Sequence, residues 1–250
     1  MSPRSDSDSQ EWTQVTRHMR KSVKRQTSLR EDIGPTPNPQ YTVQDLKIAR
    51  EKARQIWRGE DVRTCLQGLI RTQMTRHPKK ISQAVCLGLG TVEMPGAEVR
   101  AQYTVFTQLE AFLDIVATME ETQNQKIKLY FQDPKFSLAE EKHLEDMGHA
   151  VLTNPQAFST INKETFFYAP HLEWQPYLDG IASGPPAVVM GNSLDFITDA
   201  WSTEVLDTDK LVGGIEFGRN SKRIAVPNYQ YMVDGFIYWN IGGGAVEYNS

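Results

Sequence analysis

Five stretches of the sequence end in small or polar residues that could contact a ligand. Each follows a short apolar run with the length and composition of a buried strand. The residues are Gly88, Gly90 and Thr91; Asp133; Thr153 and Asn154; Pro170 and His171; and Gly191, Asn192 and Ser193. An imidazole exchanges protons near neutral pH, an activated hydroxyl is a nucleophile, and a carboxylate accepts hydrogen bonds. These residue types suit acid–base and nucleophilic chemistry.

His171 stands at a predicted strand end, in the stretch FYAPHLEW. A neutral imidazole there would act as a general acid or base, and Tyr168 beside it would contact the substrate. The alternative is a partly buried ring that is bonded to a backbone carbonyl. The position at a strand end favours the functional interpretation over the structural one.

Ser193 and Asn192 lie in the turn of MGNSLDF, where a helix is predicted to begin. Their hydroxyl and amide would meet a ligand at the helix N-terminus, or Ser193 would only cap the helix. Asp133 precedes a proline that favours an extended backbone, so its carboxylate would accept hydrogen bonds from a ribose, an amine or a guanidinium. Alternatively, Asp133 begins a turn or caps the next helix. Ser193, His171 and Asp133 could form a triad, but no Gly-x-Ser-x-Gly motif supports it.

The stretch LGLGT places Gly88 and Gly90 directly after the first apolar run, where a close backbone approach to a ligand is allowed. The third glycine of the dinucleotide motif is missing, so NAD is not predicted. The loop that begins at Thr91 contains Glu93, which would recognise part of a substrate if the loop is not merely a solvated connection. Asp195 is a further acid able to pair with a guanidinium. No metal-ligand spacing is present, and neither a metal nor a cofactor is expected.

The charge distribution is asymmetric along the chain, although the net charge is only −4. Residues 1–80 carry 17 Lys and Arg against 9 Asp and Glu, while the remainder carries 10 against 22. The predicted nucleic-acid contacts lie in the basic N-terminal stretch and are Arg17, Arg20, Lys21, Lys24 and Arg25. This stretch would bind phosphates, or it would be solvated or lean on the acidic remainder of the chain.

The order of the predicted elements indicates an α/β fold. Residues 42–57 have the capping pair and apolar spacing of a helix, and residues 61–71 would add a shorter one. From residue 84 onward, short apolar runs alternate with helical segments, which is typical of a mostly parallel sheet. Helices are expected over 101–120, 137–147, 173–182 and 194–201. We therefore predict a Rossmann-like three-layer fold with an N-terminal helical extension, in which the strand ends meet at one edge.

Composition limits the class of protein. With 250 residues, of which 39% are hydrophobic, the chain can bury a sizeable core. We expect a flexible basic arm over residues 1–40, rich in Ser, Arg and Pro, and one domain over 41–250 with its core at 84–201. No apolar run reaches the roughly 18 residues of a membrane span, and no signal peptide is evident. We expect a cytoplasmic protein, with the nucleus as the alternative location. The two cysteines of the sequence provide no disulfide framework.

Several motifs occur in a fixed order that resembles the SRR1-like domain family. They are CLGLGT, AQYTVFTQLEAFLDI, YFQDPKFSLAEEKHLEDMGHAVL, FFYAPHLEW and VVMGNS, and EWTQV near the N-terminus is similar to the family's opening. The resemblance covers roughly residues 84–201. Thr91 stands where the family commonly has Ser, and Ala169 and the Leu-Glu after His171 also depart from its pattern. We therefore expect a divergent, fungal branch of the family.

The resemblance implies either a biosynthetic enzyme or a regulatory module. Fungal arginine-containing cyclodipeptide synthases are of similar size, so peptide-bond formation from aminoacyl-tRNA is the first hypothesis, with tRNA as a partner. The second is a non-catalytic module that binds a small ligand and a protein partner, as in light, circadian or haem-related regulation. A nucleotide-dependent oxidoreductase or transferase is a weaker third.

Overall fold

The computed structural model describes residues 41–92, 99–170, 172–194, 207–227, 229 and 235–242. The description below concerns the unit Asp32–Ser250. The arm predicted over residues 1–40 lies outside the described residues, and so does most of the helix predicted over 194–201.

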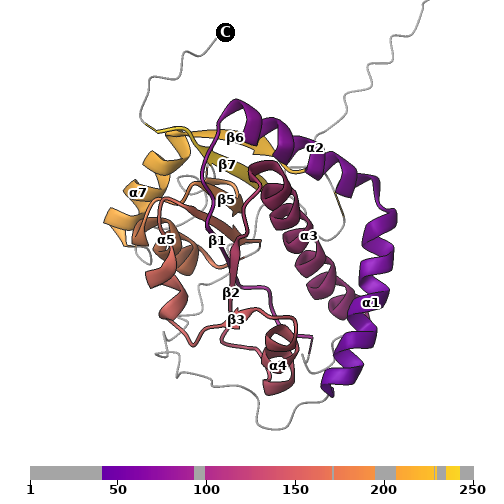
Figure 1. Ribbon diagram of the computed structural model, residues 1–250. Coiled ribbons are helices and arrows are strands. Elements are labelled where there is room, and N and C mark those ends of the chain that lie inside the picture. The colour runs from indigo at the N-terminus through magenta and orange to yellow at the C-terminus, as the bar shows by residue number, and fades with distance from the viewer. Residues whose placement is uncertain are drawn as a thin grey trace, which may run out of the picture. The chain divides into compact units, whose positions relative to one another are not determined.

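A seven-stranded sheet forms the centre of the fold, with the strand order β3-β2-β1-β4-β5-β7-β6 (Figure 1). The strands are β1 (Gln83–Leu87), β2 (Lys128–Gln132), β3 (Ala150–Val151), β4 (Thr165–Ala169), β5 (Val188–Gly191), β6 (Ser221–Ala225) and β7 (Phe236–Asn240). The first five are parallel to one another, and β7 is antiparallel to both of its neighbours. The prediction of a mostly parallel, Rossmann-like α/β fold is confirmed.

Helices cover both faces of the sheet (Figure 1). On one face lie α1 (Val43–Gly59), α2 (Asp61–Arg76), α3 (Val99–Gln123) and α4 (Leu138–Asp146); on the other lie the 3₁₀ helix η1 (Gln156–Thr160), α5 (Trp174–Ser183) and α7 (Thr208–Arg219). The sequence pattern located the first four and α5, although α2 extends further than expected. None of the helices in these described ranges is long and apolar enough to cross a membrane.

The two faces of each central strand pack into different cores. On β4, Phe166 and Tyr168 join the core beneath α1 to α4, whereas Phe167 and Ala169 join the core beneath α5 and α7. Because both faces are covered, these strands are apolar at nearly every position. The sequence therefore reveals the apolar runs, but it does not reveal which face of the sheet each side chain lies on.

One carboxylate of α3 binds both N-terminal helices. Asp114 Oδ2 accepts hydrogen bonds from Trp57 Nε1 at 2.6 Å and from Arg63 Nε at 2.5 Å. Trp57 is only 1% exposed, so its indole N–H requires a partner. The helical extension is therefore part of the packed domain.

We predict that Gly180→Ala destabilises the protein. A Cβ at Gly180 would lie 2.5 Å from Phe167 Cζ, in the core beneath α5, and such overpacking costs about 1–3 kcal/mol. The control is Gly213→Ala in α7, where nothing lies within 4 Å and alanine should stabilise the helix by roughly 0.5–1 kcal/mol. Urea unfolding of both variants tests the packing; equal effects would contradict it.

Candidate functional site

The strand order reverses between β1 and β4. The chain moves outward from β1 through β2 to β3 and then returns to place β4 on the other side of β1. Ligands of open parallel sheets bind beyond the carboxyl ends of the strands at this kind of switch point. The predicted site residues follow β1, β2, β4 and β5, which are neighbours in this part of the sheet.

The turn after β1 is fastened to the end of β2 by Asp133. Gly88 and Gly90 have φ values of 70° and 83°, which side-chain-bearing residues rarely adopt. The Gly90 N–H donates to Asp133 Oδ2 at 2.8 Å, and the Lys135 N–H donates to Asp133 Oδ1 at 2.8 Å. Asp133 therefore begins a turn, which was the structural alternative, and also lies next to the glycine turn, as the functional interpretation required.

Glu140 holds the residues that follow this turn. Its carboxylate accepts hydrogen bonds from the Thr91 hydroxyl at 2.8 Å, the Val92 N–H at 2.7 Å and the Ser137 N–H at 2.8 Å. Glu140 is only 6% exposed, and burial raises its pKa while these hydrogen bonds lower it by less. A hydroxyl that donates to a buried carboxylate has the geometry of a nucleophile beside its base.

The sequence analysis missed Glu140 as a site residue. The spacing Ser137-x-x-Glu140 is that of a capping box, and the structure forms this box at the start of α4. The pattern therefore reveals the cap. It does not indicate that Thr91 and Val92 donate hydrogen bonds to Glu140, because these residues lie in a loop more than 45 positions earlier in the chain.

The ends of β1, β4 and β5 also meet. Asn192 Nδ2 donates to the Leu172 carbonyl at 2.8 Å, which joins the loops after β4 and β5. Leu172 also covers the glycine turn, because a Cβ at Gly88 would lie 2.5 Å from Leu172 Cδ1. The structure thus brings Gly88, Gly90, Asp133 and Asn192 to one edge of the sheet.

Ser193 lies on the same edge but is mostly buried, with 6% of its surface exposed. Its hydroxyl makes no hydrogen bond of standard geometry to the described residues, although its proximity lowers the pKa of the Tyr238 hydroxyl. That hydroxyl accepts the Leu194 N–H at 2.7 Å, and burial of Tyr238, the larger influence, raises its pKa. Ser193 therefore has the phenol of Tyr238 beside it.

Tyr168 does not lie where the sequence analysis expected it. Its side chain is fully buried, and its hydroxyl donates to the Gln108 carbonyl in α3 at 3.1 Å. Burial also raises its pKa well above the ordinary value. The prediction failed because alternate residues of a strand face opposite sides, and Tyr168 faces the α3 core instead of the rim.

Other predicted site residues lie outside the described residues. They are His171, Glu93, Asp195, Arg17, Arg20, Lys21, Lys24 and Arg25. Their proposed roles stay predictions. Within the described ranges, no three His, Cys, Asp or Glu side chains are grouped so that they could hold a metal ion.

The sheet order and its glycine turn define a Rossmann-like α/β protein with a switch point between β1 and β4, where ligands of this fold class bind. The SRR1 domain family model matches residues 60–235, which is more than half of the chain. The chain belongs to the SRR1 domain family. The match begins at α2 and continues beyond β6, so it is longer than the motifs over 84–201. No curated protein matches the chain significantly.

We predict that Glu140→Ala loosens the loop after β1. The substitution leaves the Val92 and Ser137 N–H groups and the Thr91 hydroxyl without this acceptor, at a cost of about 1–3 kcal/mol. The measurements are urea unfolding and amide hydrogen exchange at Val92. Glu145→Ala, on the exposed side of α4, is the control and should change neither quantity appreciably. Unchanged Val92 exchange in Glu140→Ala would show that the carboxylate does not hold the loop.

Proposed function

We propose that this SRR1-domain protein forms a peptide bond between aminoacyl groups delivered by aminoacyl-tRNA. The observation that carries the proposal is the Thr91–Glu140 hydrogen bond beside the Gly88–Gly90 turn, at the sheet edge where ligands of this fold class bind. The resemblance to fungal arginine-containing cyclodipeptide synthases also supports it. Such a reaction needs a hydroxyl that attacks an ester carbonyl and a base that takes its proton.

Thr91 and Ser193 are the two candidate nucleophiles. In the proposed reaction, the hydroxyl oxygen attacks the aminoacyl ester, and the 3′ oxygen of the tRNA leaves with a proton. The amine of a second aminoacyl-tRNA then attacks the acyl-enzyme, which restores the hydroxyl and gives a dipeptidyl-tRNA. The free amine of this dipeptide attacks the remaining ester, so that the second tRNA leaves with a proton and the cyclic dipeptide forms. The Thr91 hydroxyl already donates to the Glu140 carboxylate, whose pKa burial raises toward the range useful for a base. Thr91 is therefore our first choice.

Charged residues would provide recognition. Asp133, together with Glu93 and Asp195, would pair with the guanidinium of an arginyl group. The five N-terminal cations named above would bind tRNA phosphates in the cytoplasm. Within the described residues, Lys52, Arg58 and Arg76 are further exposed cations on α1 and α2 that make no ion pair. Cations of this kind release counterions when they bind a phosphate backbone.

The first test is product formation. The full chain is incubated with arginyl-tRNA and a mixture of other charged tRNAs, and mass spectrometry detects cyclic dipeptides. We expect Thr91→Val, which removes only the hydroxyl, to lower the rate at least 100-fold while tRNA affinity is retained. Ser183→Ala is the matched control, because this serine bonds only to its own helix at the Asp179 carbonyl. Loss of product in Ser193→Ala but not in Thr91→Val would transfer the nucleophile role to Ser193.

The second test is the salt dependence of tRNA binding. Replacing Arg17, Arg20, Lys21, Lys24 and Arg25 by Gln should weaken binding and flatten the plot of log K against log salt, because fewer counterions are released. Fluorescence anisotropy with uncharged tRNA measures both quantities. Absence of salt-dependent binding in the parent chain, together with absence of dipeptide, would refute the proposal.

A regulatory module without turnover is the second candidate. The observation in its favour is that polar groups at the rim are bonded internally: Asp133 to two backbone N–H groups and Asn192 to the Leu172 carbonyl. A rigid rim of this kind can bind a ligand without performing chemistry on it. If no charged tRNA yields product, while a small molecule copurifies with the parent chain and is lost from Asp133→Ala, this candidate is supported.

A further inference from the structure

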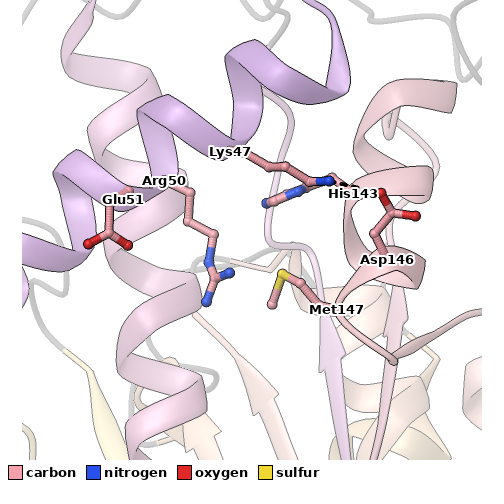
Figure 2. A pocket seen from close by; sticks show the side chains of 6 residues that line it. All are labelled: Lys47, Arg50, Glu51, His143, Asp146 and Met147. Carbon is pink, nitrogen blue, oxygen red and sulfur yellow. Dashed lines mark hydrogen bonds and ion pairs between the residues drawn. The ribbon is translucent and has the colours of Figure 1, made fainter.

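A pocket lies between α1 and α4, away from the glycine turn. Its volume is about 280 Å³. It is lined by Lys47, Arg50 and Glu51 of α1 and by His143, Asp146 and Met147 at the C-terminal part of α4 (Figure 2). Figure 2 shows Lys47 and Arg50 extending from α1 toward α4, while His143 extends in the opposite direction.

His143 is buried in this pocket without a polar partner. Only 3% of the residue is exposed, and neither ring nitrogen makes a hydrogen bond to any described residue. Its ring meets Phe106 edge to face, with centroids 6.3 Å apart, which holds the imidazole in place but satisfies no nitrogen. Buried polar atoms are nearly always hydrogen-bonded, so an unsatisfied ring N–H on a residue that lines a pocket points to a ligand with an acceptor oxygen.

The cations of the pocket have donors to spare. Arg50 binds Glu110 through Nε at 2.7 Å, and its two terminal amino groups make no hydrogen bond to the described residues. Lys47 donates to Asp146 at 3.1 Å but keeps two further donors and is 46% exposed. An arginine fork and an ammonium on one wall suit an oxyanion.

The acidic groups near the pocket are already paired. Glu51 is bound to Arg54, Glu110 to Arg50, and Asp146 to both Lys47 and Lys142. Because each of these carboxylates already has a cation, a cationic ligand would have to displace an ion pair. An anionic ligand would meet the remaining donors of Arg50 and Lys47, and the lining carboxylates beside them are already paired.

We propose that the α1–α4 pocket binds the carboxylate or phosphate group of a small metabolite, with Arg50, Lys47 and the His143 imidazole as its donors. This site goes beyond the peptide-forming function, and its test uses no tRNA, so the two can fail separately. His143 follows Glu140 by one helical turn on α4, so the ligand would bind the same helix that holds the loop after β1.

Calorimetric titration of the full chain with sodium sulfate, phosphate and succinate tests the site, with chloride at matched ionic strength as the background. We expect saturable 1:1 binding with a Kd in the millimolar range or below. Preference for succinate over sulfate and phosphate would indicate that the natural ligand carries a carboxylate. Preference for sulfate and phosphate over succinate would indicate a phosphate group. Absence of saturable binding for all three anions would overturn the proposal.

Variants connect the binding to these residues. Arg50→Lys keeps a cation beside the buried Glu110 carboxylate but loses the fork, and His143→Gln removes the imidazole; each should weaken binding at least tenfold. Lys47→Gln, at an exposed position, should weaken it about threefold. Lys52→Gln is the matched control, one turn along α1 on an exposed position that does not line the pocket. Circular dichroism checks the fold, and parent-like binding by both Arg50→Lys and His143→Gln would overturn the proposal.

The pKa of His143 distinguishes a ligand-binding ring from a purely structural one. Only in a ligand-binding ring should the pKa change when an anion binds. The pKa of His143 is lowered to about 4, mainly by burial and then by the Arg50 and Lys47 cations. Asp146 raises this pKa, and His149 lowers it slightly. A bound anion favours the imidazolium, so sulfate should raise the pKa of His143 in an NMR titration of the ring. Sulfate keeps its charge between pH 7 and pH 5, whereas the imidazole takes up a proton when the anion binds. The sulfate affinity should therefore rise as the pH falls over this range, by at most tenfold per pH unit.

His143→Gln should lose this rise and keep only the part that comes from the other titratable groups near the pocket, which are Asp146, Glu110 and His149. If sulfate leaves the pKa of His143 unchanged, the proposal is overturned. This holds even if calorimetry shows weaker anion binding in the Arg50 and Lys47 variants.

Discussion

The main-chain N–H groups after β1 must be satisfied, and two carboxylates do this. The Gly88 N–H still donates to the Gln132 carbonyl at the end of β2, at 3.4 Å, but the backbone then turns away from the sheet at Gly90 and the strand pairing ends. Asp133 and Glu140 instead accept hydrogen bonds from the Gly90 and Val92 N–H groups. The position of Thr91, and of any ligand that approaches the turn, depends on these bonds. They also join the turn to the end of β2 and to α4.

The opposite side of the switch point is held by different means. Leu172 packs over Gly88, and Asn192 binds the Leu172 carbonyl, so the loops after β4 and β5 close against the turn after β1. One side of the switch point is thus held by hydrogen bonds to two carboxylates, and the other by the packing of Leu172 and by the Asn192 hydrogen bond. The Thr91 hydroxyl lies on the carboxylate side, which is why we prefer an enzyme over a binding module.

The helical extension adds a second region of interest. Asp114 holds Trp57 and Arg63, and this contact sets α1 and α2 against α3. With α1 fixed there, Arg50 and Lys47 reach α4, and the buried His143 ring faces them. Nothing in the spacing of α4 indicates that a helix almost 100 residues earlier in the chain would place cations beside it.

The sequence by itself determined the local elements. Apolar periodicity located β1 to β5 and most helices, the Thr42–Asp45 pair marked the start of α1, and the motif order indicated the SRR1 family. It did not reveal α7, where Gly213 and Gly214 weaken the helical pattern and packing of Phe217 compensates. Only the tertiary structure decided that β7 runs antiparallel, that Tyr168 faces α3, and that Glu140 holds Thr91. These features depend on contacts between distant segments, whose energies no local pattern contains.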